Sequence, residues 1–122
     1  MQEKIINNSN TDKVYISEGC YITELSNSED DPDLSIALAR VPPGITTHWH
    51  RLINTAERYL IQSGTGIVEV GDLPPCNVHP GDIVLVPTMC RQRITNTGPD
   101  DLIFLAICTP RFMNSSYQEI PE

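Results

Sequence analysis

The stretch "PPGITTHWHRLINTAERYLIQSG" (Pro42–Gly64) decides how this chain is interpreted, because it places two histidines one residue apart and a glutamate shortly after them. Side chains on a strand alternate between its faces, so His48 and His50 are expected on one face if residues 46–50 are extended. The backbone positions of the two residues then lie about 6–7 Å apart, and their rings can converge on one ion. Glu57 opens the next expected strand, and an antiparallel return brings its carboxylate beside the histidines. The alternative is a polar loop that carries two unrelated histidines.

Short apolar stretches between turn residues predict a β protein. Ten prolines and seven glycines punctuate the chain, and turn signals recur about every 8–12 residues, a pattern typical of sandwiches and barrels. No segment between Lys13 and Pro110 keeps a helical apolar period over about ten residues. The expected strands are residues 13–25, 34–41, 57–62, 66–71, 82–87, 91–96 and 102–108. The polar tail after Pro110 is expected to form a short helix or an arm lying on a neighbouring subunit.

Length and composition indicate one domain over residues 1–122, with an ordinary hydrophobic fraction of 39%. The net charge of −8 and the lack of a basic patch argue against nucleic acid or an anionic membrane as a partner. No apolar stretch is long enough to span a bilayer or serve as a signal peptide, so we expect a cytoplasmic protein. Cys20, Cys76, Cys90 and Cys108 have long, irregular spacings and are expected to be free thiols.

The two motifs of this chain resemble those of the cupin superfamily, and specifically a small single-domain cupin with one conserved barrel. The first motif is matched by Gly44, His48, His50, Glu57 and Gly64, and the second by Gly81, Asp82, Pro87 and Asn96. The resemblance covers about residues 34–110 and implies an all-β fold, the double-stranded β-helix or jelly-roll barrel, with flanking terminal segments. It also implies that His48, His50 and Glu57 are metal ligands, and that the protein is a homodimer.

The second motif departs from the family at Gln92, which stands where the resemblance places a third histidine. An amide oxygen can bind a metal, but it is a weaker donor than imidazole. Three interpretations stay open. Gln92 completes a metal site with His48, His50 and Glu57, or it binds a water or substrate beside the ion, or the pocket holds no metal. In the first motif, the spacing from His50 to Glu57 is about two residues longer than usual.

Strand parity extends the expected pocket beyond these ligands. Four positions share a face with Glu57 or Gln92, namely Tyr59, Ile61, Cys90 and Ile94. Arg40 is expected near the mouth of the pocket. Glu57 and Tyr59 are the candidate catalytic residues. Core packing for Tyr59, a buried apolar role for Cys90 and an exposed strand end for Arg40 are the competing interpretations.

The sequence therefore predicts a metal-binding enzyme that acts on a small molecule. The cofactor is a divalent transition metal, with Fe, Mn, Ni, Co and Zn all open, and two or three coordination positions are left for substrate or oxygen. A mostly apolar wall and only eight basic residues in the chain favour dioxygenase-like or enolising chemistry over a sugar-phosphate isomerase. The alternative is a module that binds a small ligand, such as a carbohydrate, without turnover.

Overall fold

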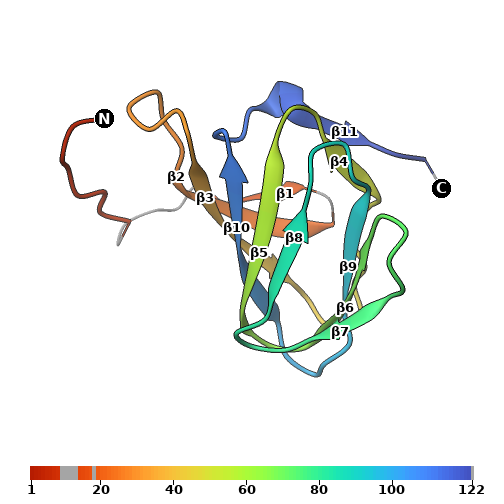
Figure 1. Ribbon diagram of the computed structural model, residues 1–122. Helices are drawn as coiled ribbons and strands as arrows, with labels where there is room; N and C mark the ends of the chain where they lie inside the picture. The colour runs from red at the N-terminus through yellow and green to blue at the C-terminus, as the bar shows by residue number, and fades with distance from the viewer. Residues whose placement is uncertain (9–13, 18, 122) are drawn as a thin grey trace.

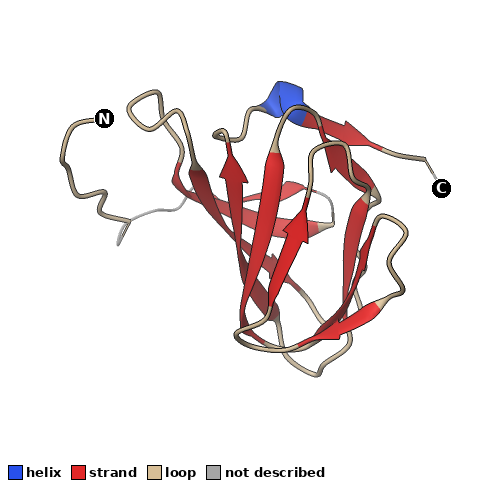
Figure 2. Ribbon diagram, in the orientation of Figure 1, coloured by secondary structure: helices blue, strands red, loops and turns tan. Residues whose placement is uncertain are grey.

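The computed structural model describes residues 1–8, 14–17 and 19–121, and these form two antiparallel sheets that face each other (Figures 1 and 2). The larger sheet contains, in spatial order, β1 (Val14–Ser17), β2 (Cys20–Ser26), β3 (Ser35–Val41), β10 (Leu102–Thr109), β5 (Ala56–Ser63) and β8 (Ile83–Val86). The smaller contains β11 (Tyr117–Glu119), β4 (His50–Leu52), β9 (Gln92–Asn96), β6 (Gly66–Val70) and β7 (Cys76–Val78). One 3₁₀ turn, η1 (Asn114–Ser116), precedes β11. The predicted all-β jelly-roll barrel is thereby confirmed.

Alternating side chains explain why the strands pack as they do. In β6 the buried residues are Gly66, Val68 and Val70, while Ile67 and Glu69 between them are only half-buried. Aliphatic and aromatic side chains from both sheets meet in one core between the layers. Burial of such side chains, each contributing about 1.5–3 kcal/mol, is the main force that holds the sheets together.

The last residues of the two sequence motifs stabilise the loops at one end of the barrel. Gly64 has a φ of +85°, and a Cβ built there would lie 2.6 Å from the carbonyl oxygen of Asp101, so this position requires glycine. The buried Asn96 amide donates to the carbonyl oxygens of Val41 (2.8 Å) and Asp100 (2.7 Å). Its Oδ1 accepts the Gly98 N–H at 2.9 Å. The Asn96 side chain therefore satisfies three backbone groups, one at the end of β3 and two in the loop between β9 and β10.

Several boundaries differ from those expected. In the expected strand 13–25, the described residues 14–17 and 19–25 form β1, a turn at Gly19 with a φ of +84°, and most of β2. Residues 13 and 18 lie outside the described residues. Residues 46–49 are not a strand, apart from one isolated bridge between Thr46 and Thr95. The short strands β4, β7 and β11 were not expected, because three residues carry too little periodicity to be recognised. The tail forms only the three-residue 3₁₀ turn η1, and then β11 pairs with β4 of its own chain.

Two further sequence expectations concern the whole chain. The four cysteines are free thiols, as predicted, with Cys20 and Cys108 buried and Cys76 exposed. No helix in the described ranges is long and apolar enough to cross a membrane.

Candidate active site

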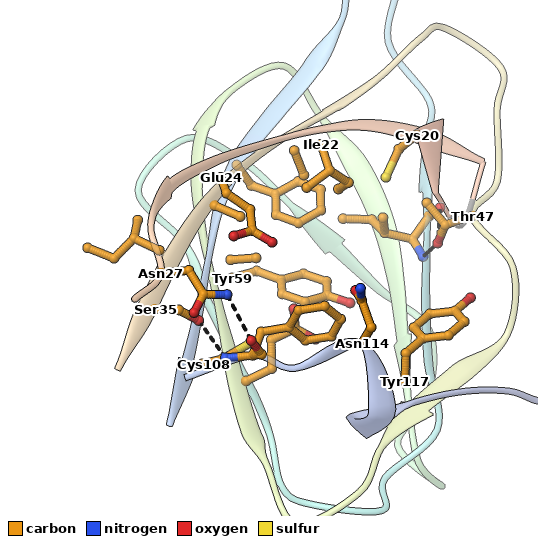
Figure 3. Close-up of a pocket in the computed structure, with 18 residues that line it drawn as sticks. Cys20, Ile22, Glu24, Asn27, Ser35, Thr47, Tyr59, Cys108, Asn114 and Tyr117 are labelled. Carbon is orange, nitrogen blue, oxygen red and sulfur yellow. Dashed lines mark hydrogen bonds between the residues drawn. The ribbon is translucent and has the colours of Figure 1, made fainter. Parts of the chain in front are cut away.

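A cavity of about 260 Å³ opens between the two sheets, over the inner face of β2, β3, β10 and β5 (Figure 3). Most of its wall is apolar. The segment that follows β10 closes one side, where Phe112, Asn114 and Tyr117 face the cavity. Asn27 and Ser35 hold this segment in place, because the Asn27 amide donates to the Phe112 carbonyl oxygen and Ser35 Oγ accepts the Phe112 N–H, both at 2.8 Å.

The cavity exists because the middle of its floor is made of alanines. Strand register places Glu24, Ala37, Ala106 and Tyr59 in one row across β2, β3, β10 and β5. Neighbouring strands lie about 4.8 Å apart, so the two ends of this row are about 14 Å apart at the backbone. Methyl side chains in the middle leave the space that larger residues would fill. The row therefore has a carboxylate at one end and a phenol at the other.

Glu57 and Tyr59 stand together at the β5 end of the cavity. Both line it, and because they are two residues apart on one strand their side chains share the inner face. Oε1 of Glu57 is shielded from solvent. The Tyr59 ring stacks on Phe104 with centroids 4.6 Å apart, which fixes the direction of its hydroxyl.

The Tyr59 hydroxyl donates a hydrogen bond to Oε1 of Gln92, which is fully buried on β9. Nε2 of Gln92 has no hydrogen-bond partner among the described residues. A buried amide with one unsatisfied end is costly and uncommon in protein cores. Gln92 itself does not line the cavity, so its visible effect on the site is to hold the Tyr59 hydroxyl.

His50 is buried behind Tyr117, with 1% of its surface exposed and the two rings stacked at 5.2 Å. Its Nδ1 lies 2.8 Å from the His48 carbonyl oxygen, an acceptor, so Nδ1 carries the proton and donates it. Burial lowers the pKa of His50, although the His48 carbonyl and the Glu57 carboxylate partly oppose that shift. The ring is therefore neutral at pH 7, with its lone pair on Nε2.

His48 does not share the face of His50, contrary to expectation. Its side chain is 58% exposed, and Nδ1 lies 2.8 Å from Oε1 of Glu119 on β11, outside the cavity. The reason is that residues 46–49 are not a regular strand, so the alternation of faces fails there. The inward residue is Thr47, whose Oγ1 accepts the Ile94 N–H at 3.0 Å.

The arrangement of the four predicted ligands does not fit a metal ion. His48 faces away, and Oε1 of Gln92 already accepts the Tyr59 hydroxyl. Across the described ranges, no three His, Cys, Asp or Glu side chains are grouped so that they could hold a metal. His50, Glu57 and Gln92 lie on the inner side, and His48 does not. Metal binding by these residues stays a prediction, and it requires the His48 side chain to turn inward.

The remaining predicted pocket residues divide into two groups. Tyr59 and Ile94 line the cavity, whereas Ile61 belongs to the core beside it. Arg40 lies away from the cavity, 3.3 Å from an Asp101 carboxylate oxygen and stacked on the Tyr21 ring, because it alternates with the buried Ala39 and Val41.

Cys90 lies in the turn before β9 rather than on the strand, so it does not share the face of Gln92. Burial raises the pKa of its thiol, which keeps the group protonated at neutral pH. The positions of both residues agree better with the competing interpretations, a strand-end residue outside the pocket for Arg40 and an apolar packing role for Cys90.

Sequence reasoning missed several polar residues that line the cavity, namely Glu24, Asn27, Ser35, Thr47, Asn114 and Tyr117. A signal existed for Glu24, since it shares parity on β2 with the buried Cys20 and Ile22. No periodic signal existed for Asn114 or Tyr117, because contacts distant in sequence place the tail.

The family model described as a cupin domain matches residues 37–108. The chain belongs to the cupin family. No curated relative matches it. Similar cupin-like structures include an uncharacterised conserved protein with a double-stranded β-helix domain from Klebsiella pneumoniae, with 17% identity and a TM-score of 0.76. That match covers 99% of this chain and 100% of the other.

Two other similar structures are of named proteins. Pac13 from Streptomyces, a nucleoside dehydratase, has a TM-score of 0.80 at 13% identity, with coverage of 98% of this cupin and 92% of Pac13. Variants of Pac13 with a tyrosine or a histidine replaced have been solved with uridine. KdgF from Halomonas has a TM-score of 0.76 at 18% identity, with coverage of 89% and 96%. At these identities the likeness shows the fold.

Proposed function

We propose that this cupin is a small-molecule enzyme that moves protons at carbon next to a carbonyl group, with Glu57 as the base. The observation that carries the proposal is the pairing of Glu57 and Tyr59 on the wall of a largely apolar cavity of about 260 Å³. A carboxylate shielded from water is a stronger base than one in solvent, because desolvation disfavours its charged form.

The residues around this pair have distinct roles in the proposed reaction. Glu57 accepts a proton from the carbon next to the carbonyl group and returns it to a neighbouring atom of the enolate. The hydroxyl hydrogen of Tyr59, now donated to Gln92, can rotate about the C–O bond toward the carbonyl oxygen of the substrate and stabilise the charge that develops there, while the ring stays in place. His50 is neutral, stacks on Tyr117 and does not line the cavity, so it does not contact the substrate directly in this reaction.

Similarity to small-molecule enzymes such as the nucleoside dehydratase Pac13 supports this class of function and leaves the substrate open. Dioxygenase-like chemistry at a divalent metal is the second candidate. The specific observation in its favour is that His50 Nδ1 donates to a backbone carbonyl, as metal-bound histidines commonly do to fix their other nitrogen. It needs His48 to leave Glu119, which the first candidate does not.

A turnover assay tests the proposal. Protein purified in the presence of a chelator would be incubated with hydroxyketones, β-diketones, aldoses and uridine, and products recorded by NMR. We expect isomerisation or elimination product from one class, at least a 100-fold lower rate in Glu57→Gln, and an unchanged rate in Glu29→Gln, an exposed loop control. Saturable binding with no product in any class would support the binding-module alternative instead.

A further inference from the structure

Glu24 stands at the opposite end of the alanine row from Tyr59, and its position in the cavity suggests a use that the proton transfer does not need (Figure 3). Its carboxylate is directed into the cavity. Among the described residues it has no hydrogen-bond or ion-pair partner. A carboxylate facing a cavity in this way remains available to hydrogen-bond donors of a ligand.

The charge of the cavity wall is one-sided. Glu24 and Glu57 both line it, and no Lys, Arg or His side chain of the described ranges does so. Arg111 comes close to the wall, since its Nη1 donates to Oδ1 of the lining residue Asn27 at 3.0 Å, but its guanidinium does not itself line the cavity. A phosphate or carboxylate group inside the cavity would therefore face two carboxylates, with no cationic side chain on the wall between them, which is unfavourable.

We propose that Glu24 is the specificity-determining residue of this cavity. It accepts hydrogen bonds from hydroxyl or amino groups at the end of the substrate remote from Glu57, so the substrate is a neutral or cationic hydroxylated molecule and not an anion. This inference rests on the proposed function for the identity of the cavity as the substrate site. It adds the substrate class and the residue that sets it.

The backbone distance between the two ends of the alanine row agrees with two separate roles. About 14 Å of backbone separates the two ends of the row, and the side chains of Glu24 and Tyr59 project into the space between. A molecule of the size of a nucleoside or a hexose can contact both ends across the alanine floor. The reacting carbon then lies beside Glu57 and the hydroxylated end beside Glu24.

Binding of matched probes tests the inference. Uridine, glucose and glucosamine would be titrated by NMR or calorimetry beside uridine 5′-monophosphate and glucose 6-phosphate, with wild type, Glu24→Gln and Glu29→Gln. Hydrogen bonds to a charged group change affinity by about 10–100-fold. We expect at least one unphosphorylated probe to bind wild type at least tenfold more tightly than its phosphorylated counterpart, and Glu24→Gln to lose most of that preference. Comparison of glucose with glucosamine separates hydroxyl from amino recognition.

Three results would overturn the inference: phosphorylated probes that bind wild type as well as their counterparts, an unchanged preference in Glu24→Gln, or no binding by any unphosphorylated probe. The wild-type comparison tests the predicted substrate class even if Glu24→Gln does not fold. The Glu57→Gln variant separates this inference from the proposed function. Loss of turnover with the binding preference retained supports both, whereas binding without turnover in wild type overturns the proposed function alone.

Discussion

Removal of the Tyr59 hydroxyl should destabilise the protein through its effect on Gln92. Tyr59→Phe deletes the donor to Oε1 of Gln92 and leaves a fully buried amide with neither end paired by a described residue. A buried polar group that loses its partner costs about 1–3 kcal/mol, so the free energy of unfolding should fall by that amount. Urea denaturation followed by circular dichroism measures it, with the linear extrapolation applied to each variant.

A second substitution separates this cause from lost packing. Gln92→Leu removes the amide and its desolvation cost. Tyr59 still lines the cavity in this variant, so its hydroxyl is not left buried against apolar atoms alone. We expect Gln92→Leu to lie within about 1 kcal/mol of wild type, because both ends of the unfavourable group are gone. In that background Tyr59→Phe should cost less than about 0.5 kcal/mol. An equal cost of Tyr59→Phe in both backgrounds would refute the reasoning.

The remaining predictions concern the metal, pH and assembly. If His48 is a ligand, Glu119→Gln should tighten Zn²⁺ or Ni²⁺ binding in a competition titration, because it frees the His48 imidazole, and Gln92→His should tighten that binding further. Equal metal content in wild type and in the double variant His48→Ala, His50→Ala, measured by elemental analysis, would contradict the metal site. Because burial lowers the folded-state pKa of His50, the unfolded chain binds an extra proton as pH falls below about 6.5, and stability is lost from there downward. His50→Gln should flatten this dependence between about pH 5 and 6.5 in chemical denaturation, and an unchanged slope would count against it. The predicted homodimer should give twice the monomer mass in light scattering, and a monomer mass for wild type at micromolar concentration would reject the dimer. The edge strand β8 offers an apolar surface for dimer contacts, because Ile83 and Leu85 on it are 64% and 68% exposed, so Leu85→Lys should weaken the dimer.

Strand alternation made most of the fold predictable. Segments such as residues 66–71 and 82–87 alternate clearly, and buried valines of β6 and β8 meet in the core as that pattern requires. The last residue of each motif was equally informative. Gly64 is needed because a side chain there would collide with the backbone, and Asn96 is needed because its amide pairs with backbone groups. Local chemistry therefore determined these features.

The candidate site was only partly predictable, because it depends on where alternation stops. Glu57, Tyr59 and Ile94 lie on regular strands and line the cavity as expected. His48 lies in a segment that is not a strand, and its contact with Glu119 depends on the distant strand β11. The cavity itself comes from Ala37 and Ala106, two small residues that strand pairing brings together and that no motif distinguishes.

Isotope exchange tests the proposed role of Glu57 most directly, because it detects proton removal even when no net product accumulates. Wild-type protein would be incubated in D₂O with the carbonyl compound that gives turnover or the strongest binding, and deuterium at the carbon next to the carbonyl group followed by NMR. We predict incorporation well above the uncatalysed rate in wild type and Glu29→Gln, and its loss in Glu57→Gln. Incorporation at the same rate in Glu57→Gln, or none in wild type with a ligand that binds the cavity, would contradict the account.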